Sequence, residues 1–305
     1  GFFFQAEYGI RYSSVTGFQR VLFRSLVGTA VSFESPSVSS LLPAVLPDCT
    51  LQRSTATSSV FEAARSADPA FARFVRRNTH PHKAPGYAIV DVSLKVPGET
   101  PGDITSEQME VVADLGRRYS HDEIRVNYQQ NLLLPHVKLD DLPAVHSALA
   151  AAGLATPNID LVTDIIACPG LDYCALANAR AIPVAQHIAE RFADPERAEL
   201  IGELKIKISG CINACGHHHA GHIGILGVDK KGEEFYQLTL GGSGEEDAAL
   251  GQMLGPALPA DKVTDAVEQM VEVYLRERKD GERFLDTFRR TGVAPFKEAV
   301  YADAH

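Results

Sequence analysis

Four of the five cysteines in this 305-residue chain form two close pairs, and these pairs constrain the fold more than any other feature. Cys168 and Cys174 have the spacing C-x5-C within ACPGLDYC, and Cys211 and Cys215 have the spacing C-x3-C within SGCINACG. Both pairs lie in segments that contain glycine, at positions 170, 210 and 216. The sequence therefore predicts two tight turns that carry sulfur ligands.

Four thiolates that arrive as two pairs suit a cubane [4Fe-4S] cluster, because soft thiolates select iron–sulfur clusters and small residues let backbone N–H groups approach the sulfurs. Cys174 also precedes a helical pattern, whose free N–H groups would favour an anionic cluster. A structural zinc site is one alternative, although C-x5-C lies outside the usual zinc spacings. Buried free thiols are the other alternative.

Composition excludes several classes of protein. A net charge of −10 argues against a nucleic-acid partner, since phosphate neutralisation needs a basic face. The sequence contains no apolar run near the roughly 20 residues of a membrane helix, so we expect no membrane partner. Cysteines in two tight internal pairs do not resemble a secreted disulfide framework, and we therefore expect a cytoplasmic protein.

Residues 1–60 are poorly patterned and show no sustained hydrophobic period. Their second half is rich in Ser, Thr and Pro, which is typical of loops or disorder. A targeting segment is one interpretation. The other is that SVTGFQRVLFRS is a translated sequencing adapter, so that residues 1–60 are partly or wholly non-native and Cys49 carries no function.

Residues 61–155 are predicted to form an α+β unit, a ferredoxin-like half-domain. FEAARSADPAFARFVRRN predicts short helices, and TSEQ is a capping box that begins a helix ending near Tyr119. The alternation in YAIVDVSLKV predicts a half-buried strand, with its outward face formed by Asp91, Ser93 and Lys95. Two strands, EIRVNYQ and NLLLPHV, and a helix that stops at Gly153 complete the order strand, helix, strand, strand, helix.

Residues 156–305 are predicted to form a second domain, of α/β type. ALANARAIPVAQHIAERF has a helical pattern that Pro183 should kink or split. LKIKIS predicts a strand with a solvated face formed by Lys205 and Lys207, and HIGILGV and FYQLTL predict a hairpin. A final amphipathic helix spans residues 263–274.

In combination, ACPGLDYC and SGCINACG, with 36 residues between Cys174 and Cys211, resemble the sirohaem and iron–sulfur domain of the nitrite/sulfite reductase family. QQNLLL at residues 129–134 and YQLTLGG at residues 236–242 also resemble this family, and the similarity extends from about Phe61 to the C-terminus. The resemblance implies a sirohaem/[4Fe-4S] domain at residues 156–305. It also implies that a ferredoxin-like half-domain precedes it.

By this resemblance, the four cysteines hold one [4Fe-4S] cluster and Cys215 is also the axial ligand of the sirohaem iron. Gln130 and Asn131 match a pair that lies against the sirohaem, and Asn213 is a further candidate cofactor contact. Asn127 stands where many relatives have Thr, and Ile212 where Pro is common. For the three histidines at residues 217–219, the alternatives are contacts at the haem edge, solvated or core positions, and an independent metal site.

The resemblance implies six-electron reduction of sulfite to sulfide, with nitrite to ammonia as the alternative. It implies that the chain is the C-terminal half of the enzyme and is inactive alone. The catalytic residues are therefore unassigned, because the substrate-binding Arg and Lys residues lie largely in the N-terminal half. The electron donor would be a flavoprotein subunit or a ferredoxin. The alternative from another functional class is that the chain is not an enzyme but a four-cysteine electron carrier or a zinc module.

Overall fold

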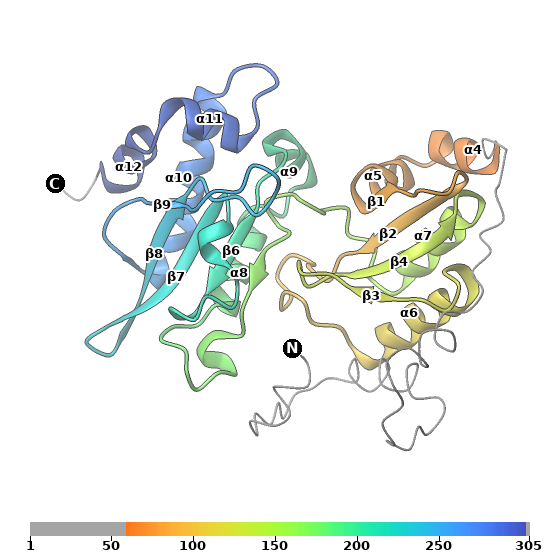
Figure 1. Cartoon of the computed structure of the whole chain (residues 1–305), viewed down its shortest axis with the longest axis horizontal. Coiled ribbons are helices and arrows are strands. Elements are labelled where there is room, and N and C mark those ends of the chain that lie inside the picture. The colour runs from red at the N-terminus through yellow and green to blue at the C-terminus, as the bar shows by residue number, and fades with distance from the viewer. Residues whose placement is uncertain (1–58, 303–305) are drawn as a thin grey trace, which may run out of the picture. The chain divides into compact units, whose positions relative to one another are not determined.

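In the computed structural model, which describes residues 59–302, the chain divides into two units (Figure 1). The first unit contains the described residues up to Val92, together with Ile104–Asn127 and Leu132–Ala155. The second unit contains Thr156 onward and two segments from within the sequence of the first, Ser93–Asp103 and Tyr128–Asn131. The interpretation of residues 1–60 lies outside the described residues, except for Ser59 and Val60, which begin a helix.

The first unit is a four-stranded antiparallel sheet, in the strand order β1-β2-β4-β3, with helices packed on it. Its elements are α4 (Ser59–Ala67), α5 (Pro69–Asn78), β1 (Thr79–Pro81), β2 (Tyr87–Val92), α6 (Ser106–Tyr119), β3 (Arg125–Val126), β4 (Leu132–Lys138), η1 (Leu139–Asp141) and α7 (Leu142–Ala151). The predicted order of strands and helices is therefore present from β2 to α7.

Local sequence signals account for the helix boundaries in this unit. The Thr105 hydroxyl accepts a hydrogen bond from the Gln108 N–H (3.2 Å), and the Gln108 side chain accepts one from the Thr105 N–H (3.0 Å), which is the predicted capping box of α6. The Asp68 carboxylate caps α5 by accepting hydrogen bonds from the N–H groups of Ala70 and Phe71, and Pro69 occupies the first turn. Gly153 ends α7 with a left-handed φ of 72°.

The strand predicted at YAIVDVSLKV is confirmed over Tyr87–Val92, but the prediction that its outward face is solvated was wrong. Strand β2 ends at Val92, and Asp91, Ser93 and Lys95 are 1%, 0% and 2% exposed. Asp91 accepts a hydrogen bond from the Asn127 side chain (3.2 Å), and Lys95 forms an ion pair with Asp164 (3.1 Å). Polar partners on the expected outward face therefore compensate the burial of these groups.

The second unit contains a mixed six-stranded sheet. Its strand order is β10-β8-β7-β6-β5, with β9 also paired to β8. Strands β5, β6 and β7 are parallel, whereas β7 and β8 form the predicted antiparallel hairpin. Its elements are β5 (Ile166–Ala167), η2 (Gly170–Asp172), α8 (Ile182–Arg191), α9 (Pro195–Ile201), β6 (Ile206–Ser209), η3 (His218–Ala220), β7 (Ile223–Lys230), β8 (Glu233–Leu240), β9 (Gln252–Met253), β10 (Leu258–Pro259), α10 (Ala260–Glu277), α11 (Phe284–Thr291) and α12 (Ala294–Tyr301).

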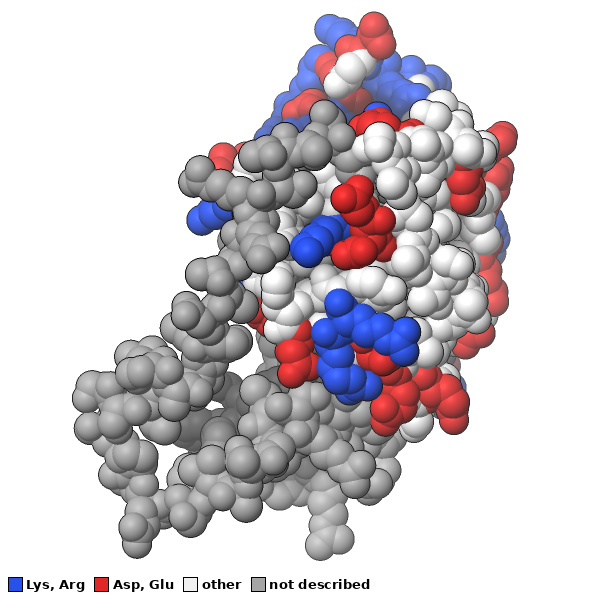
Figure 2. Space-filling model, turned by 90° about the vertical axis from the view of Figure 1, so that its right-hand side faces the viewer, with Lys and Arg blue, Asp and Glu red and all other residues white. Residues whose placement is uncertain are grey.

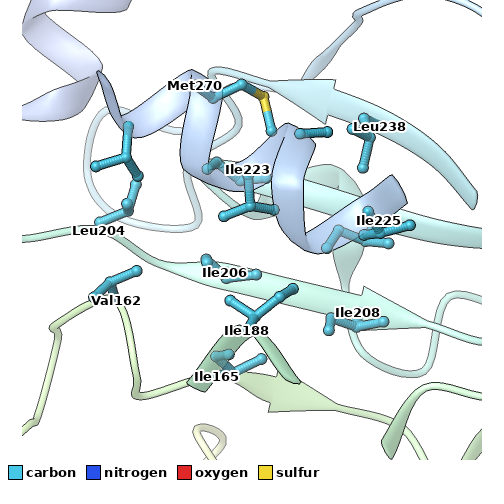
Figure 3. Close-up of a cluster of buried hydrophobic side chains, with 14 of the residues drawn as sticks. Val162, Ile165, Ile188, Leu204, Ile206, Ile208, Ile223, Ile225, Leu238 and Met270 are labelled. Atoms are coloured by element: carbon cyan, nitrogen blue, oxygen red, sulfur yellow. The ribbon is translucent and has the colours of Figure 1, made fainter. Parts of the chain in front are cut away.

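The core of the second unit lies between one face of this sheet and helices α8 and α10 (Figures 1 and 3). Figure 3 shows Met270 from α10 and Ile188 from α8 beside a row of branched strand residues, Ile206, Ile208, Ile223, Ile225 and Leu238. All of these side chains are at most 1% exposed. The predicted inward residues of β6 are therefore confirmed, and their burial fixes the register of the strand that leads to Cys211.

Two helix predictions in this unit were wrong. Pro183 lies in the first turn of α8, after Ile182, and does not kink a longer helix, because a first-turn residue needs no N–H for an intrahelical bond. Cys174 consequently follows the short turn η2 and lies outside any helix start. The predicted final helix is α10, but α11 and α12 follow it and pack beside it.

Exposed charged side chains contribute little to the stability of either unit. On the face shown in Figure 2, basic and acidic side chains stand next to one another with uncharged surface between them. Exposed ion pairs such as that between Arg118 and Asp114 (2.6 Å) contribute at most about 1 kcal/mol. Within residues 59–302, no helix is both long and apolar enough to cross a membrane.

His222 is a buried histidine whose protonation makes the stability of the second unit depend on pH. It is 2% exposed and stacks on Phe284, with the ring centroids 6.3 Å apart, and its Nδ1 accepts a hydrogen bond from the Lys205 N–H (3.2 Å). Burial, followed by the nearby cation of Lys205, lowers the pKa of His222 to about 3. The imidazole is therefore neutral in the folded protein at neutral pH.

We expect His222 to make the chain less stable in mild acid. Between the unfolded pKa of about 6.5 and the folded value, the unfolded chain binds the extra proton, so the free energy of unfolding falls as pH falls. From pH 7.5 to 5.5 this residue should account for a loss of about 1.4 kcal/mol. Urea unfolding should show this loss in the wild type and in the exposed control His187→Asn, but not in His222→Asn. Equal losses in all three proteins would contradict the assignment.

Candidate iron–sulfur site

The two cysteine pairs come together at the carboxyl ends of neighbouring parallel strands. Cys168 directly follows β5, and Cys211 follows β6 after one glycine. The Cys168 N–H donates to the Ile208 carbonyl (3.1 Å), and the Gly210 N–H donates to the Cys168 Sγ (3.0 Å). The carboxyl edge of a parallel sheet is where α/β proteins commonly build binding sites.

Direct contact between the two loop backbones requires glycine at position 210. A Cβ atom there would lie 2.6 Å from the Ala179 carbonyl oxygen and 2.8 Å from the Gly170 Cα, closer than real Cβ contacts. The Gly210 carbonyl accepts hydrogen bonds from the N–H groups of Asn178 (2.8 Å) and Ala179 (3.0 Å). Backbone contacts therefore hold the first cysteine loop against the second, in addition to the hydrogen bond to the Cys168 sulfur.

The four thiols share one electrostatic environment. Cys168 and Cys211 are 8% and 7% exposed, Cys174 is half-buried, and Cys215 is exposed. Burial raises the pKa of the Cys215 thiol, and the thiols of Cys168, Cys211 and Cys174 raise it further. A bound metal centre would reverse this effect, because its positive charge stabilises thiolates.

The donor set fits an iron–sulfur cluster better than a single ion. Among residues 59–302, no group of three or more His, Cys, Asp or Glu side chains is arranged to hold one metal ion. A cubane distributes its four thiolates over different irons, so its ligands converge less closely than those of a single zinc. The assignment of Cys168, Cys174, Cys211 and Cys215 as cluster ligands stays a prediction, which the meeting of their two loops at one sheet edge supports.

The second cysteine loop has a strained backbone. Ala214 and His217 both adopt left-handed conformations, with φ values of 57° and 53°. The Gly216 N–H donates a hydrogen bond to the Ser209 hydroxyl (3.1 Å). Gly216 also packs against the Ile208 carbonyl so closely that a Cβ atom at this position would overlap the carbonyl oxygen. Such strain, at roughly 1–3 kcal/mol for each residue, persists only where the surrounding contacts determine it, and it often marks functional sites.

The three consecutive histidines do not face a common centre. His217 and His219 are exposed, whereas His218 is 7% exposed. The His218 Nε2 lies 3.4 Å from the His219 Nδ1, while the His218 Nδ1 has no hydrogen-bond partner within the described residues. Burial lowers the pKa of His218 to about 4. Its orphaned nitrogen is a polar group that a bound partner could satisfy.

The asparagine and glutamine residues predicted to contact the cofactor occupy different surroundings. The Gln130 amide donates a hydrogen bond to the Ala167 carbonyl and accepts one from the Ala167 N–H. Asn131 is fully buried, and its side-chain oxygen accepts a hydrogen bond from the Leu94 N–H (3.0 Å). Asn213 is exposed between Cys211 and Cys215. The assignment of Gln130, Asn131 and Asn213 as cofactor contacts stays a prediction.

The predicted solvated face at Lys205 and Lys207 was wrong, because Lys205, directly before β6, is half-buried and Lys207, within β6, is buried. Lys205 is half-buried among the carboxylates of Asp160, Glu203 and Glu245, and the closest of these is 2.8 Å away. Lys207 is 5% exposed, and within the described part of the chain no carboxylate lies within ion-pair distance of it. Its ammonium lies 5.8 Å from the centre of the Tyr128 ring, and burial lowers its pKa.

The position of β6 explains why these lysines are buried. It lies between β5 and β7, and a parallel strand inside a sheet is covered on both faces. The sequence signal was a lysine in strand alternation immediately before a cysteine turn. Lys207 is therefore a buried positive charge four residues before Cys211 that has no ion pair within the described residues, although Glu245 attracts it at longer range.

The cysteine loops also expose large apolar side chains. Leu171, Tyr173 and Leu176 on the first loop are 42%, 62% and 71% exposed, and Ile212 on the second loop is 84% exposed. Apolar side chains gathered at one site usually mark a surface that contacts a ligand or another protein. The site is therefore bordered by surface that suits a large, partly apolar partner.

Comparisons with known proteins agree with this geometry. Residues 80–152 match the family model described as the nitrite/sulfite reductase ferredoxin-like half domain. Residues 159–305 match the model described as the nitrite and sulphite reductase 4Fe-4S domain, which contains all four paired cysteines. The chain belongs to the nitrite and sulfite reductase family.

Members of this family with either substrate are similar to the chain. It is 30% identical over 217 residues to sulfite reductase [ferredoxin] 2 of Mycolicibacterium paratuberculosis, a match that covers 67% of this chain and 39% of that protein. It is 27% identical over 200 residues to ferredoxin–nitrite reductase of Synechococcus elongatus, covering 63% of this chain and 37% of that protein. The chain thus spans about two fifths of the length of the curated relatives that it matches.

Solved structures show the same fold. The structure of the Mycobacterium tuberculosis NirA protein superposes with a TM-score of 0.58 at 26% identity, over 71% of this chain and 42% of that one. Dissimilatory sulfite reductase I also superposes with a TM-score of 0.58, but at 14% identity, so it supports the fold alone. The predicted fold class, a ferredoxin-like half-domain followed by the 4Fe-4S domain, is confirmed.

We expect Gly216→Ala to disrupt the second cysteine loop, because the new methyl group would overlap the Ile208 carbonyl. The free energy of unfolding of the metal-free chain should fall by about 2 kcal/mol or more, as for other overpacked sites. Gly244→Ala is the matched control, since a Cβ there meets its nearest atom at 3.7 Å. Urea unfolding of both variants measures the difference, and equal stability would contradict the described loop packing.

Proposed function

We propose that this chain carries the iron–sulfur half of a sirohaem-dependent sulfite reductase that reduces sulfite to sulfide with six electrons. The observation that carries the proposal is the joining of C-x5-C and C-x3-C at one sheet edge, in a chain of this family. Cys168, Cys174, Cys211 and Cys215 would hold the [4Fe-4S] cluster, which supplies electrons one at a time when bound.

Sirohaem binding is the finer part of the proposal, and features of this chain support it. The exposed thiol of Cys215 is free to face a second iron outside the cluster. The apolar side chains of Leu171, Tyr173, Leu176 and Ile212 provide surface for a macrocycle. The tetrapyrrole would supply the site of oxyanion binding and reduction, and the protein would orient it.

Among residues 59–302, Lys207 is well suited to an anion. Burying an ammonium without an acid partner is costly, so a bound oxyanion or cofactor carboxylate would lower the free energy of this arrangement. Lys205 is less suited, because three carboxylates already surround its charge. We propose that Lys207 contributes positive charge to the bound anion. Further basic residues would come from outside the described residues.

Sulfite is preferred to nitrite because the sulfite reductases among the relatives reach 30% identity, against 27–28% for the nitrite reductases. Nitrite reduction to ammonia is the second candidate, since both activities occur among proteins matched over similar lengths. A ferredoxin is the preferred electron donor, because the names of relatives with either activity include ferredoxin. We place the reaction in the cytoplasm, because Cys168, Cys174, Cys211 and Cys215 form no disulfide bonds.

The test is to produce the chain in cells that supply sirohaem and to record its absorption spectrum, iron content and turnover. We expect macrocycle bands, about five irons per chain and a spectral shift on adding sulfite. Turnover with a chemical reductant should be weak or absent, because the matched reductases are more than twice as long as the matched region. If turnover is seen, the ratio of sulfite to nitrite rates decides between the substrates.

Each contrary result removes a defined part of the proposal. A brown protein without macrocycle bands would reject sirohaem binding by this chain and favour a four-cysteine electron carrier. A colourless protein with one zinc would reject the cluster and favour a structural module. A larger spectral shift with nitrite than with sulfite would reject the substrate preference.

A further inference from the structure

Gln130 supplies backbone-like hydrogen bonds to the last residue of β5. Its Nε2 donates to the Ala167 carbonyl (2.8 Å), and its Oε1 accepts from the Ala167 N–H (3.2 Å). Strand β5 is the edge of its sheet, and its neighbour Cys168 already bonds to Ile208 of β6. The polar groups of successive residues in a strand point to opposite sides, so the Ala167 groups face the open edge. The Gln130 amide thus takes the place of a missing strand.

The segment Tyr128–Asn131 is held on both sides of Gln130. The Lys95 ammonium donates to the Gln129 carbonyl (2.7 Å) and to Asp164 (3.1 Å). The Asn131 side chain donates to the same Asp164 oxygen (3.2 Å). The side chains of Lys95 and Asp164 are 1% and 2% exposed, and a buried ion pair of this kind is costly to break from either side.

Gln130 itself has a backbone conformation that needs such support. Its φ of 65° is left-handed, which costs a residue with a side chain roughly 1 kcal/mol or more. The fixed neighbours on either side determine this conformation and aim the amide at Ala167. These contacts all lie within the second unit, which includes Ser93–Asp103 and Tyr128–Asn131.

The hydrogen bonds from Gln130 to Ala167 also affect the position of Cys168, the next residue in the chain. Ala167 leads directly into Cys168, whose sulfur accepts the Gly210 N–H at 3.0 Å. A shift of Ala167 along or away from β6 would therefore move the Cys168 sulfur relative to the second cysteine loop. Its displacement would change the ligand geometry of the whole site.

We propose that Gln130 is a positioning residue for the iron–sulfur site: its amide completes the open edge of β5 and fixes the Cys168 sulfur. This role differs from direct contact with the tetrapyrrole, which the resemblance implied for Gln130. The inference rests on the proposed function where it concerns the bound cluster. The hydrogen bonds to Ala167 can be tested without the cluster.

Gln130→Met is the informative variant, because methionine has a similar length and lacks both hydrogen-bonding groups. Gln186→Met is the matched control, since the Gln186 side chain donates to the Gly98 carbonyl (3.1 Å) in the same unit, away from the cysteines. In the metal-free chain, hydrogen exchange of the peptide over residues 165–168 should be about tenfold faster in Gln130→Met. A tenfold change corresponds to about 1.4 kcal/mol, close to the worth of one or two hydrogen bonds.

The cluster-loaded chain gives the second readout. After anaerobic reconstitution, Gln130→Met should release iron to a chelator several-fold faster than the wild type and shift the electron paramagnetic resonance of the reduced cluster. Gln186→Met should do neither, even if its melting temperature falls equally. Should Gln130→Met fail to fold, Gln130→Glu keeps the acceptor for the Ala167 N–H and should show smaller changes in the same directions.

Two failures are distinguishable in this design. The positioning role would be overturned if the Gln130 variants exchanged hydrogen and released iron at the wild-type rates. It would also be overturned if their changes were no larger than those in Gln186→Met. If the wild-type chain accepts no iron–sulfur cluster, the proposed function fails, and the exchange measurement still decides whether Gln130 holds Ala167.

Discussion

The backbone contact between the two cysteine loops is the constraint on which the site depends. Strands β5 and β6 are parallel neighbours, so their carboxyl ends deliver Cys168 and Cys211 to one edge. The absence of a side chain at Gly210 then lets the second loop touch Gly170 and accept two N–H groups of the first. Cysteines 43 positions apart in the sequence, Cys168 and Cys211, thus become members of one ligand set.

The rest of the second unit holds these strand ends in place. The apolar face of β6 and β7 packs under α8 and α10, which fixes the strand register from one side. On the open edge of β5, the Gln130 amide supplies the missing polar contacts, and the buried pair of Lys95 and Asp164 holds the segment that carries Gln130. Gln130 and Lys95 come from two segments that lie within the sequence of the ferredoxin-like half domain. The iron–sulfur domain is therefore completed by residues outside residues 159–305.

Burial and ion pairing determine which side chains near the site carry a charge. Buried histidines such as His218 and His222 are kept neutral by desolvation, which lowers the pKa of each. Lys205 is compensated by three carboxylates, whereas Lys207, two residues later, has none within ion-pair distance among the described residues. Within the described residues, this site contains one buried cation without an ion pair and one buried nitrogen without a hydrogen-bond partner, so it is suited to an anionic, hydrogen-bonding ligand.

Sequence patterns predicted the parts of this structure that depend on local signals. The capping box at Thr105, the inward residues of β6 and the two cysteine turns all follow from spacing and residue type. The burial of Lys207 and Asp91 was missed because strand alternation cannot show that the second face is also covered. The role of Pro183 was missed because the same residue can kink a helix or begin one.

Long-range pairing accounts for the remaining misses. Gln130 was singled out only through the family resemblance, and its contact with Ala167 joins positions 37 residues apart. No periodicity in the sequence indicates such a contact. The same holds for Lys95 and Asp164, which are 69 positions apart and form one buried pair. These side chains are placed by the tertiary fold, so only the structure could assign their partners.

The most direct test of this account is the iron and acid-labile sulfide content of the anaerobically reconstituted chain, measured for the wild type, Cys174→Ser and Cys49→Ser. The account predicts about four irons and four sulfides per chain in the wild type and in Cys49→Ser, and loss of most of both in Cys174→Ser. A single zinc, no bound sulfide, or equal retention of iron in Cys174→Ser would contradict a four-cysteine cluster at the joined loops.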